Sequence, residues 1–83
     1  MTPPVYYTGR ARRDLKRLDS LTARRVVGAI ERYFGEGVGE ARRLKGSERQ
    51  YRLRIGDWRV VFSREVRGDV TILAVSHRHR AYR

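Results

Sequence analysis

The chain has 83 residues, no cysteine, and a formal net charge of +11 from 20 Lys and Arg residues against 9 Asp and Glu residues. This length supports one domain over residues 1–83 with a single hydrophobic core. Without cysteine no disulfide or thiolate metal site can form, and two histidines cannot make a zinc site alone, so we expect no metal and no cofactor. No apolar run reaches the roughly 18 residues that span a bilayer. We therefore expect a soluble, cytoplasmic protein that binds a polyanion and not a membrane.

The first forty residues predict one strand and two helices. Residues 5–7 are β-prone, and Thr8 can cap a helix over residues 9–18. Asp19 and Ser20 can cap a second helix, whose apolar residues repeat at helical spacing as far as Phe34. Glycines at positions 35, 37 and 39 then predict a loop. We interpret the basic residues of the first helix as a solvated face: Arg10, Arg12, Arg13, Lys16 and Arg17.

The centre of the chain predicts a β-hairpin. Two runs that alternate apolar and polar residues, 51–55 and 58–62, flank Gly56 and Asp57. A two-residue connection that begins with glycine fits a type II′ turn. That turn sets three facing pairs: Ile55 with Trp58, Arg54 with Arg59, and Leu53 with Val60. One face of the hairpin then collects the apolar residues: Tyr51, Leu53, Ile55, Trp58, Val60 and Phe62.

The opposite face of this hairpin is unusual because it collects arginines. Arg52, Arg54 and Arg59 lie on it, with Val61 as its only large apolar member. Like charges directly opposed across an antiparallel pair are unfavourable, by up to about 1 kcal/mol. The stability of the fold does not require Arg54 opposite Arg59, so this arginine face indicates an anionic ligand. The alternative is a solvated sheet face in an arginine-rich chain.

The remaining residues complete an α+β fold. Residues 70–75 are continuously apolar, as in a central strand covered on both faces, and residues 76–83 form a basic tail that carries both histidines. The element order β-α-α-β-β-β predicts a small antiparallel sheet packed against an N-terminal helical hairpin. The apolar sheet face should meet the helices and leave the arginine face open. The helical residues expected at this contact are Ala11, Leu15, Leu18, Val26, Val27 and Ile30.

These pieces, in this order, resemble the RelE/ParE toxins of type II toxin–antitoxin pairs. The similarity rests on Tyr7-Thr8 with Asp14-Leu15, on Leu44-Lys45-Gly46, on the hairpin over 51–62, and on Val75-Ser76-His77-Arg78 followed by Tyr82. The pieces cover nearly the whole chain. The RelE branch of the family implies a metal-independent endoribonuclease that cuts mRNA in the ribosomal A site and inhibits translation. The ParE branch implies a toxin that inhibits DNA gyrase.

The resemblance also implies a set of site residues. The basic residues that surround the scissile phosphate in RelE-like enzymes, and their C-terminal tyrosine, match Arg52, Arg54, Arg59, Arg78 and Tyr82. The like-charge argument, which does not use the resemblance, already indicates three of these five residues: Arg52, Arg54 and Arg59. RNA-binding roles are implied for a wider basic set: Lys45, Arg52, Arg54, Arg80 and Arg83. The alternative for Lys45 is a residue that only forms a turn, and the alternative for residues 78–83 is a basic tail without a role in the site. For Trp58, a place in the core is the alternative to stacking on a base.

The general base is the open question of the chemistry. Family members often have lysine where this chain has Arg52 and Arg54, and arginine is effectively never deprotonated. Three candidates for the base remain: His77, His79, and an ionised Tyr82 whose pKa is lowered by surrounding cations. His77 is the first choice because it directly precedes Arg78 and leaves the last strand beside the expected phosphate site.

The expected partners follow from the family and the charge. A cognate antitoxin with an acidic C-terminal segment is implied, together with mRNA and the ribosomal A site. Operator DNA is expected only as a partner of the toxin–antitoxin complex. Two alternatives remain open: a gyrase inhibitor of the same fold, and an inactive member that serves as a DNA-binding co-repressor with its antitoxin.

Overall fold

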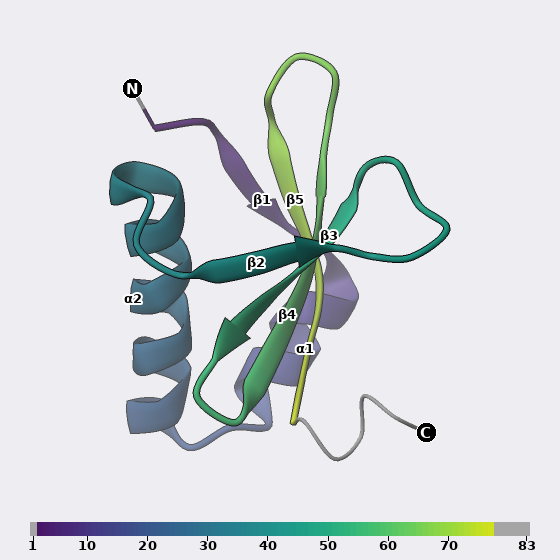
Figure 1. The fold of residues 1–83 in the computed structure, drawn as a ribbon. Coiled ribbons are helices and arrows are strands. Elements are labelled where there is room, and N and C mark those ends of the chain that lie inside the picture. Colours follow the sequence, from purple (N-terminus) through teal and green to yellow (C-terminus); the bar gives the residue numbers. More distant parts are fainter. Residues whose placement is uncertain (1, 78–83) are drawn as a thin grey trace.

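The computed structural model describes residues 2–77, which form two helices and one mixed sheet. The elements in chain order are β1 (Val5–Tyr7), α1 (Gly9–Lys16), α2 (Ser20–Glu36), β2 (Glu40–Arg43), β3 (Gln50–Ile55), β4 (Trp58–Arg64) and β5 (Val70–His77). The strands are ordered β1-β5-β4-β3-β2 across the sheet. Figure 1 shows α2 standing on one side of the strands, with α1 behind them. The predicted α+β class is confirmed.

The sheet differs from the prediction at both of its edges. Residues 40–43, predicted to begin in a loop, form the edge strand β2, which pairs antiparallel with β3. At the other edge β1 pairs parallel with β5, with Val5 beside Val70, so the sheet is mixed and not wholly antiparallel. The chain can reach the β3 edge because Gly37 takes a left-handed conformation, with φ of 75°, and ends α2. Helix α2 thus includes Gly35, which we predicted to lie in the loop.

Both predicted helix caps are confirmed. The Thr8 hydroxyl accepts a hydrogen bond from the Ala11 backbone N–H at 3.0 Å, and the Asp19 carboxylate accepts one from the Thr22 N–H at 3.3 Å. Hydrogen bonds from the Thr22 side chain and backbone lower the pKa of Asp19. Helix α1 ends at Lys16, with Arg17 as its C-cap, which is two residues earlier than predicted. Neither helix in residues 2–77 is long and apolar enough to cross a membrane.

The core lies between the helices and the predicted apolar face of the hairpin. The register that the turn predicted is confirmed, because Ile55, Arg54 and Leu53 pair with Trp58, Arg59 and Val60, and Gly56 has a left-handed φ of 56°. The hairpin residues Leu53, Val60 and Phe62 are buried, while Tyr51, Ile55 and Trp58 pack against this core. From the other elements come the remaining buried side chains: Ala11, Val26, Ile30, Phe34, Val70, Ile72 and Val75.

Phe62 is the centre of this core. Its ring stacks on Tyr51 with centroids 5.3 Å apart, and it packs edge to face with Phe34 with centroids 4.9 Å apart. Full burial of such a side chain contributes about 1.5–3 kcal/mol to stability, and offset or edge-to-face aromatic pairs each add about 0.5–1.5 kcal/mol. This cluster joins α2 to β3 and β4, so it fixes the strands that carry the arginine face.

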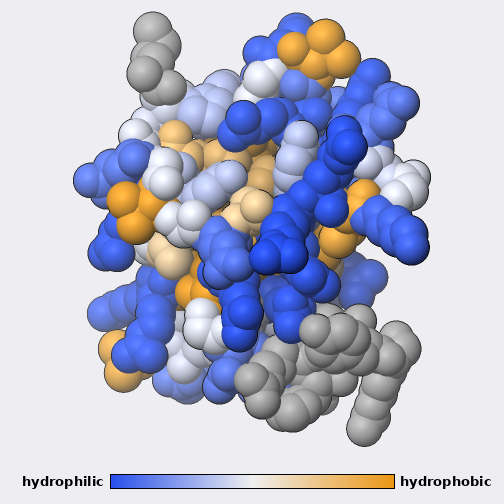
Figure 2. Space-filling model, viewed as in Figure 1, coloured by the Kyte–Doolittle hydropathy of each residue, from blue (hydrophilic) through white to orange (hydrophobic). Residues whose placement is uncertain are grey.

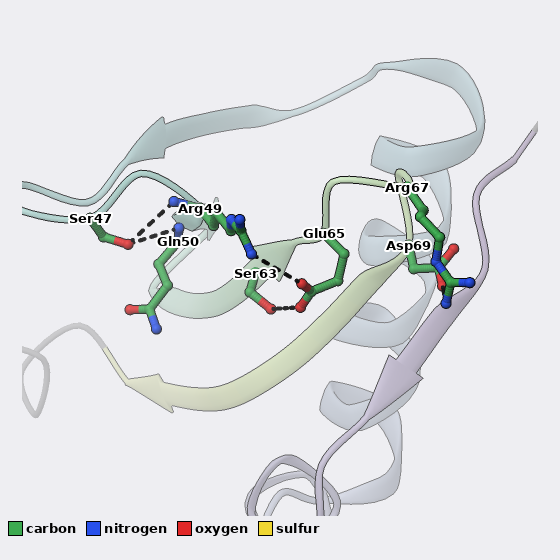
Figure 3. A network of polar contacts seen from close by, with 7 residues as sticks. All are labelled: Ser47, Arg49, Gln50, Ser63, Glu65, Arg67 and Asp69. Atoms are coloured by element: carbon green, nitrogen blue, oxygen red, sulfur yellow. Dashed lines mark hydrogen bonds and ion pairs between the residues drawn. The ribbon is translucent and has the colours of Figure 1, made fainter.

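A polar network joins the two turns at the far end of the hairpin (Figure 3). Arg49 in the turn after β2 lies 3.8 Å from one carboxylate oxygen of Glu65, and the other oxygen accepts a hydrogen bond from the Ser63 hydroxyl at 3.5 Å. The Ser47 hydroxyl accepts hydrogen bonds from the backbone N–H groups that follow it. Lys45 lies in this same turn, as one of the sequence interpretations has it, and its side chain is exposed.

Candidate functional site

The arginine face crosses three strands. Arg52 and Arg54 lie on β3 and Arg59 lies on β4, where the register places Arg54 directly opposite Arg59. The edge strand β2 extends the face, because Arg42 pairs with Arg52 and Glu40 pairs with Arg54. Figure 2 shows that hydrophilic side chains cover much of the surface on the side of β2, with only scattered hydrophobic patches.

Glu40 changes the electrostatics predicted for this face. One row across the sheet reads Glu40, Arg54, Arg59 and Ser76, so Arg54 has a carboxylate on one side and a guanidinium on the other. The Glu40 carboxylate also lies 3.9 Å from an Arg42 nitrogen. The acid therefore offsets part of the like-charge repulsion that the hairpin alone predicted. Sequence reasoning missed this acid because β2 was not predicted.

A groove of about 1060 Å³ lies between the sheet and α1. Arg52 and Arg59 line it from the sheet, and Arg10, Asp14 and Arg17 line it from α1. Arg59 is only 9% exposed, which differs from the open arginine face that the sequence predicted. Arg54 and Lys45 are exposed and do not line the groove. The predicted basic set is therefore divided between the groove and the surface beside it.

Helix α1 is attached to β5 by hydrogen bonds that follow on from the short strand β1. The Thr8 backbone N–H donates to the Ile72 carbonyl and the Thr8 hydroxyl donates to the Leu73 carbonyl, both at 3.0 Å. Six residues further along, on α1, the Asp14 carboxylate accepts a hydrogen bond from the Val75 N–H at 2.9 Å. These contacts hold α1 along β5 where β1 has ended, and so they set the width of the groove.

His77 lies at the end of β5, paired with Trp58. The two rings meet edge to face, with centroids 5.1 Å apart and planes at 90°. Trp58 packs against the core, as one sequence interpretation predicted, and both rings also line the groove. Ser76, and not His77, is the direct neighbour of Arg59 across the strands. His77 thus lines the same groove as Arg59, although on β5 it is the residue after Ser76, which faces Arg59.

Comparison with known proteins decides the family. The model of the ParE toxin of the type II toxin–antitoxin system parDE matches residues 5–82. The chain belongs to the RelE/ParE toxin family. A search of curated protein sequences gave no match.

Solved structures of related toxins share this fold. The archaeal RelE–RelB complex from Pyrococcus horikoshii matches with a TM-score of 0.77 and 26% identity, over 96% of this chain and 99% of that chain. The RelBE2 complex from Mycobacterium tuberculosis matches with a TM-score of 0.71 and 29% identity, over 94% and 100%. A double arginine-to-alanine mutant of Escherichia coli RelE matches with a TM-score of 0.78 over 99% and 90%, and its 16% identity shows the fold alone.

The remaining predicted site residues of the toxin lie outside residues 2–77: Arg78, His79, Arg80, Tyr82 and Arg83. Within the described part, no three His, Asp or Glu side chains gather into a group that could hold a metal ion. Two basic groove residues were not predicted as part of the site, Arg10 and Arg17, because helical charges in a basic chain usually lie on a solvated face. Asp14 entered the sequence analysis only through the family resemblance. The helix dipole gave no signal for it, because Asp14 lies before the last turn of the helix predicted over residues 9–18 and enters the last turn only where the structure ends α1 at Lys16.

Proposed function

We propose that this toxin is a metal-independent, ribosome-dependent endoribonuclease that cuts mRNA in the A site and inhibits translation in the cytoplasm. The observation that carries the proposal is the convergence of Arg52 and Arg59 with the α1 arginines on one groove. Grouped like charges destabilise a fold, and functional sites are where such costs are tolerated. Guanidinium groups bind phosphate oxygens through paired hydrogen bonds, so an RNA backbone suits the groove.

The chemistry requires three roles. A base removes the proton from a ribose 2′-OH, and the 2′-oxygen forms a bond to the adjacent phosphorus while the bond from phosphorus to the 5′-oxygen breaks. An acid then protonates the leaving 5′-oxygen, which yields a 2′,3′-cyclic phosphate and a 5′-OH. Arg52, Arg54 and Arg59 are assigned to the stabilisation of the negative charge that builds on the phosphate oxygens. Arg78 is assigned the same role, and Tyr82 is assigned to base stacking or ribose orientation.

His77 is proposed as the base because arginine cannot accept the proton. A neutral imidazole can accept it, and histidine is the side chain whose charge ordinarily changes between pH 5 and 8. His77 lines the same groove as Arg59 and packs edge to face with Trp58, and this position supports the role. His79 and Tyr82 are the alternative bases.

We propose a cognate antitoxin with an acidic C-terminal segment as the physiological inhibitor. Solved relatives of this fold include RelE–RelB complexes from Pyrococcus horikoshii and Methanococcus jannaschii. The net charge of +11 favours an acidic partner, and a segment that is disordered when free can wrap a large surface. Operator DNA is proposed as a partner only of the resulting complex.

Inhibition of DNA gyrase is the second candidate function. The observation that favours it is that the matching family model is that of the ParE toxin. This function needs no RNA chemistry, so it predicts that substitution of the groove arginines leaves toxicity intact.

One experiment separates the two functions. The toxin is induced in cells, mRNA 5′ ends are mapped, and gyrase-dependent DNA breaks are measured in the same cultures. We expect new mRNA 5′ ends within codons shortly after induction, with no increase in DNA breaks. DNA breaks without new mRNA ends would replace the nuclease by the gyrase inhibitor.

A further inference from the structure

The basic residues of α1 divide into two groups by helix face. Arg10, Asp14 and Arg17 line the groove, at a spacing of four and then three residues that places them on one side of the helix. Arg12, Arg13 and Lys16 are exposed and do not line it. Residues that are close neighbours in the sequence therefore have different surroundings, and only the first group faces the sheet arginines across the groove.

The position of this helix face is fixed by a specific contact. The Asp14 carboxylate, only 14% exposed, accepts a hydrogen bond from the Val75 N–H at 2.9 Å. Arg10 lies 3.9 Å from the same carboxylate and is 71% exposed. Asp14 thus holds α1 against β5 at the level of the groove, while the arginines one turn before and one turn after it extend toward solvent at its edge.

The groove also has a gradient of exposure. Arg59 is buried, Arg52 is half-buried, and Arg10 and Arg17 are exposed. Among the described residues that line the groove, four are arginines and one, Asp14, is an acid. Charge is therefore arranged as two walls, with the deeper guanidinium groups on the sheet and the more exposed ones on α1.

We propose that Arg10 and Arg17 bind the phosphates of a single RNA strand on the side of the groove opposite Arg52 and Arg59. The inference rests on the proposed nuclease function and adds to it a second wall that positions the nucleotides flanking the cleaved bond. Arg10 and Arg17 are positioning residues, since the charge stabilisation at the cleaved phosphate is assigned to the sheet.

The lining of the groove favours RNA over an acidic peptide. Apolar and aromatic residues also line the groove, among them Leu18, Leu44, Leu73 and Trp58. Proteins that bind single-stranded nucleic acid combine a cationic groove for the backbone with apolar and aromatic surfaces for the bases. An acidic peptide needs only the positive charges and not the apolar lining. A groove that binds such a peptide in preference to RNA is therefore the outcome that would contradict this inference.

The test compares two double variants that remove the same charge. Arg10→Gln/Arg17→Gln removes the groove wall, and Arg12→Gln/Lys16→Gln removes two positive charges from the other side of α1. The probe is a fluorescent oligouridylate of about ten nucleotides, a length within the usual range for such grooves, with 2′-O-methyl riboses that prevent cleavage. Its affinity is measured by anisotropy at several salt concentrations, beside that of a polyglutamate peptide of equal charge.

We expect the groove variant to bind the RNA more weakly than its control and to have a shallower salt dependence. Loss of two phosphate contacts should reduce the slope of log K against log salt by about 1.4. Equal RNA binding by the two variants would overturn the inference, as would a difference seen only with polyglutamate or a parent chain that does not bind the RNA. Failure of the nuclease proposal has another signature, because the parent chain would then bind the RNA but cut no mRNA.

Discussion

The Asp14 carboxylate on α1 accepts a hydrogen bond from the backbone N–H of Val75 on β5 at 2.9 Å. Strand β1 pairs with β5 only as far as Ile72, so Asp14 supplies an acceptor to the part of β5 that has passed the end of β1. A side chain thereby takes the place of a neighbouring strand and joins the helix to the sheet at the groove.

We predict that Asp14→Ala lowers the free energy of unfolding by about 1–3 kcal/mol, because the N–H of Val75 then loses its acceptor in a partly buried place. Asp14→Asn keeps an oxygen acceptor and should cost clearly less. Chemical denaturation of the two variants measures the difference. Equal losses would indicate that the charge near Arg10 matters and the hydrogen bond does not.

The second prediction concerns the opposed pair Arg54 and Arg59. Arg54→Gln, at an exposed position, should leave the free energy of unfolding within about 0.5 kcal/mol of the parent or raise it, because like-charge repulsion is removed. Arg59 is buried, so Arg59→Gln also loses packing and should cost no more than about 1 kcal/mol. Toxicity should fall by orders of magnitude. Thermal unfolding and growth after induction measure the two effects, with Arg67→Gln on the exposed turn before β5 as the control for charge. A melting temperature that falls sharply in both variants would show that the pair is structural.

The hairpin can be predicted from sequence because its information is local. Gly56 and Asp57 define the turn, the turn defines the register, and the alternation of side chains defines which face is buried. Those three steps predict the Arg54–Arg59 pair, and the observed strand register confirms it. The helix caps are equally local, since Thr8 and Asp19 act on backbone groups three residues away.

The edges of the sheet could not be predicted in the same way. Strand β2 has only four residues, three of them charged, and it follows closely spaced glycines that favour a loop. It forms because the outer edge of β3 offers hydrogen-bonding partners, which is a tertiary effect. Similarly, the three residues of β1 carry no signal for parallel pairing with β5, which lies more than sixty positions later. The position of Glu40 beside Arg54 depends on β2, so it could not be predicted either.

The third prediction concerns alkaline stability and Tyr7. Burial, and then the negative charge of Glu31, raise the pKa of the Tyr7 phenol above its ordinary value of 10.0. The folded state therefore favours the protonated phenol. Its contribution to stability is complete below about pH 10 and is lost as the pH rises through the raised folded-state pKa. Tyr7→Phe should lose less stability between about pH 9 and pH 11 than the parent, as measured by denaturant unfolding.

Glu31→Gln is the companion variant for Tyr7. It removes the second cause of the raised pKa while leaving the burial of the phenol, so its alkaline loss of stability should lie between those of the parent and of Tyr7→Phe. Identical pH profiles for the parent and Tyr7→Phe would refute the assignment.

The fourth prediction concerns the antitoxin. With a net charge of +11, association with an acidic segment should be steered by long-range attraction, so its rate should fall steeply as salt is added. Stopped-flow mixing of toxin and antitoxin from low to physiological salt measures this rate. An association rate that does not change over that range would rule out electrostatic steering.

The last prediction concerns the base. If His77 accepts the 2′-OH proton, the single-turnover rate of mRNA cleavage should rise with pH as the imidazole loses its proton, and then level off. His77→Ala should slow cleavage by roughly 100-fold or more and remove this pH dependence, in the range for one lost general base. His79→Ala should cost much less.

The control for His77 addresses its contact with Trp58. Because the two rings pack edge to face at 5.1 Å, His77→Ala also removes a packing partner at the end of β5. Trp58→Phe disturbs the same contact but keeps the imidazole, so it should preserve the shape of the pH profile even where the rate falls. A His77→Ala enzyme that cleaves at the parental rate with an unchanged profile would exclude His77. Because arginine cannot take its place, the proton acceptor would then be sought at Tyr82, by cleavage assays of Tyr82→Phe.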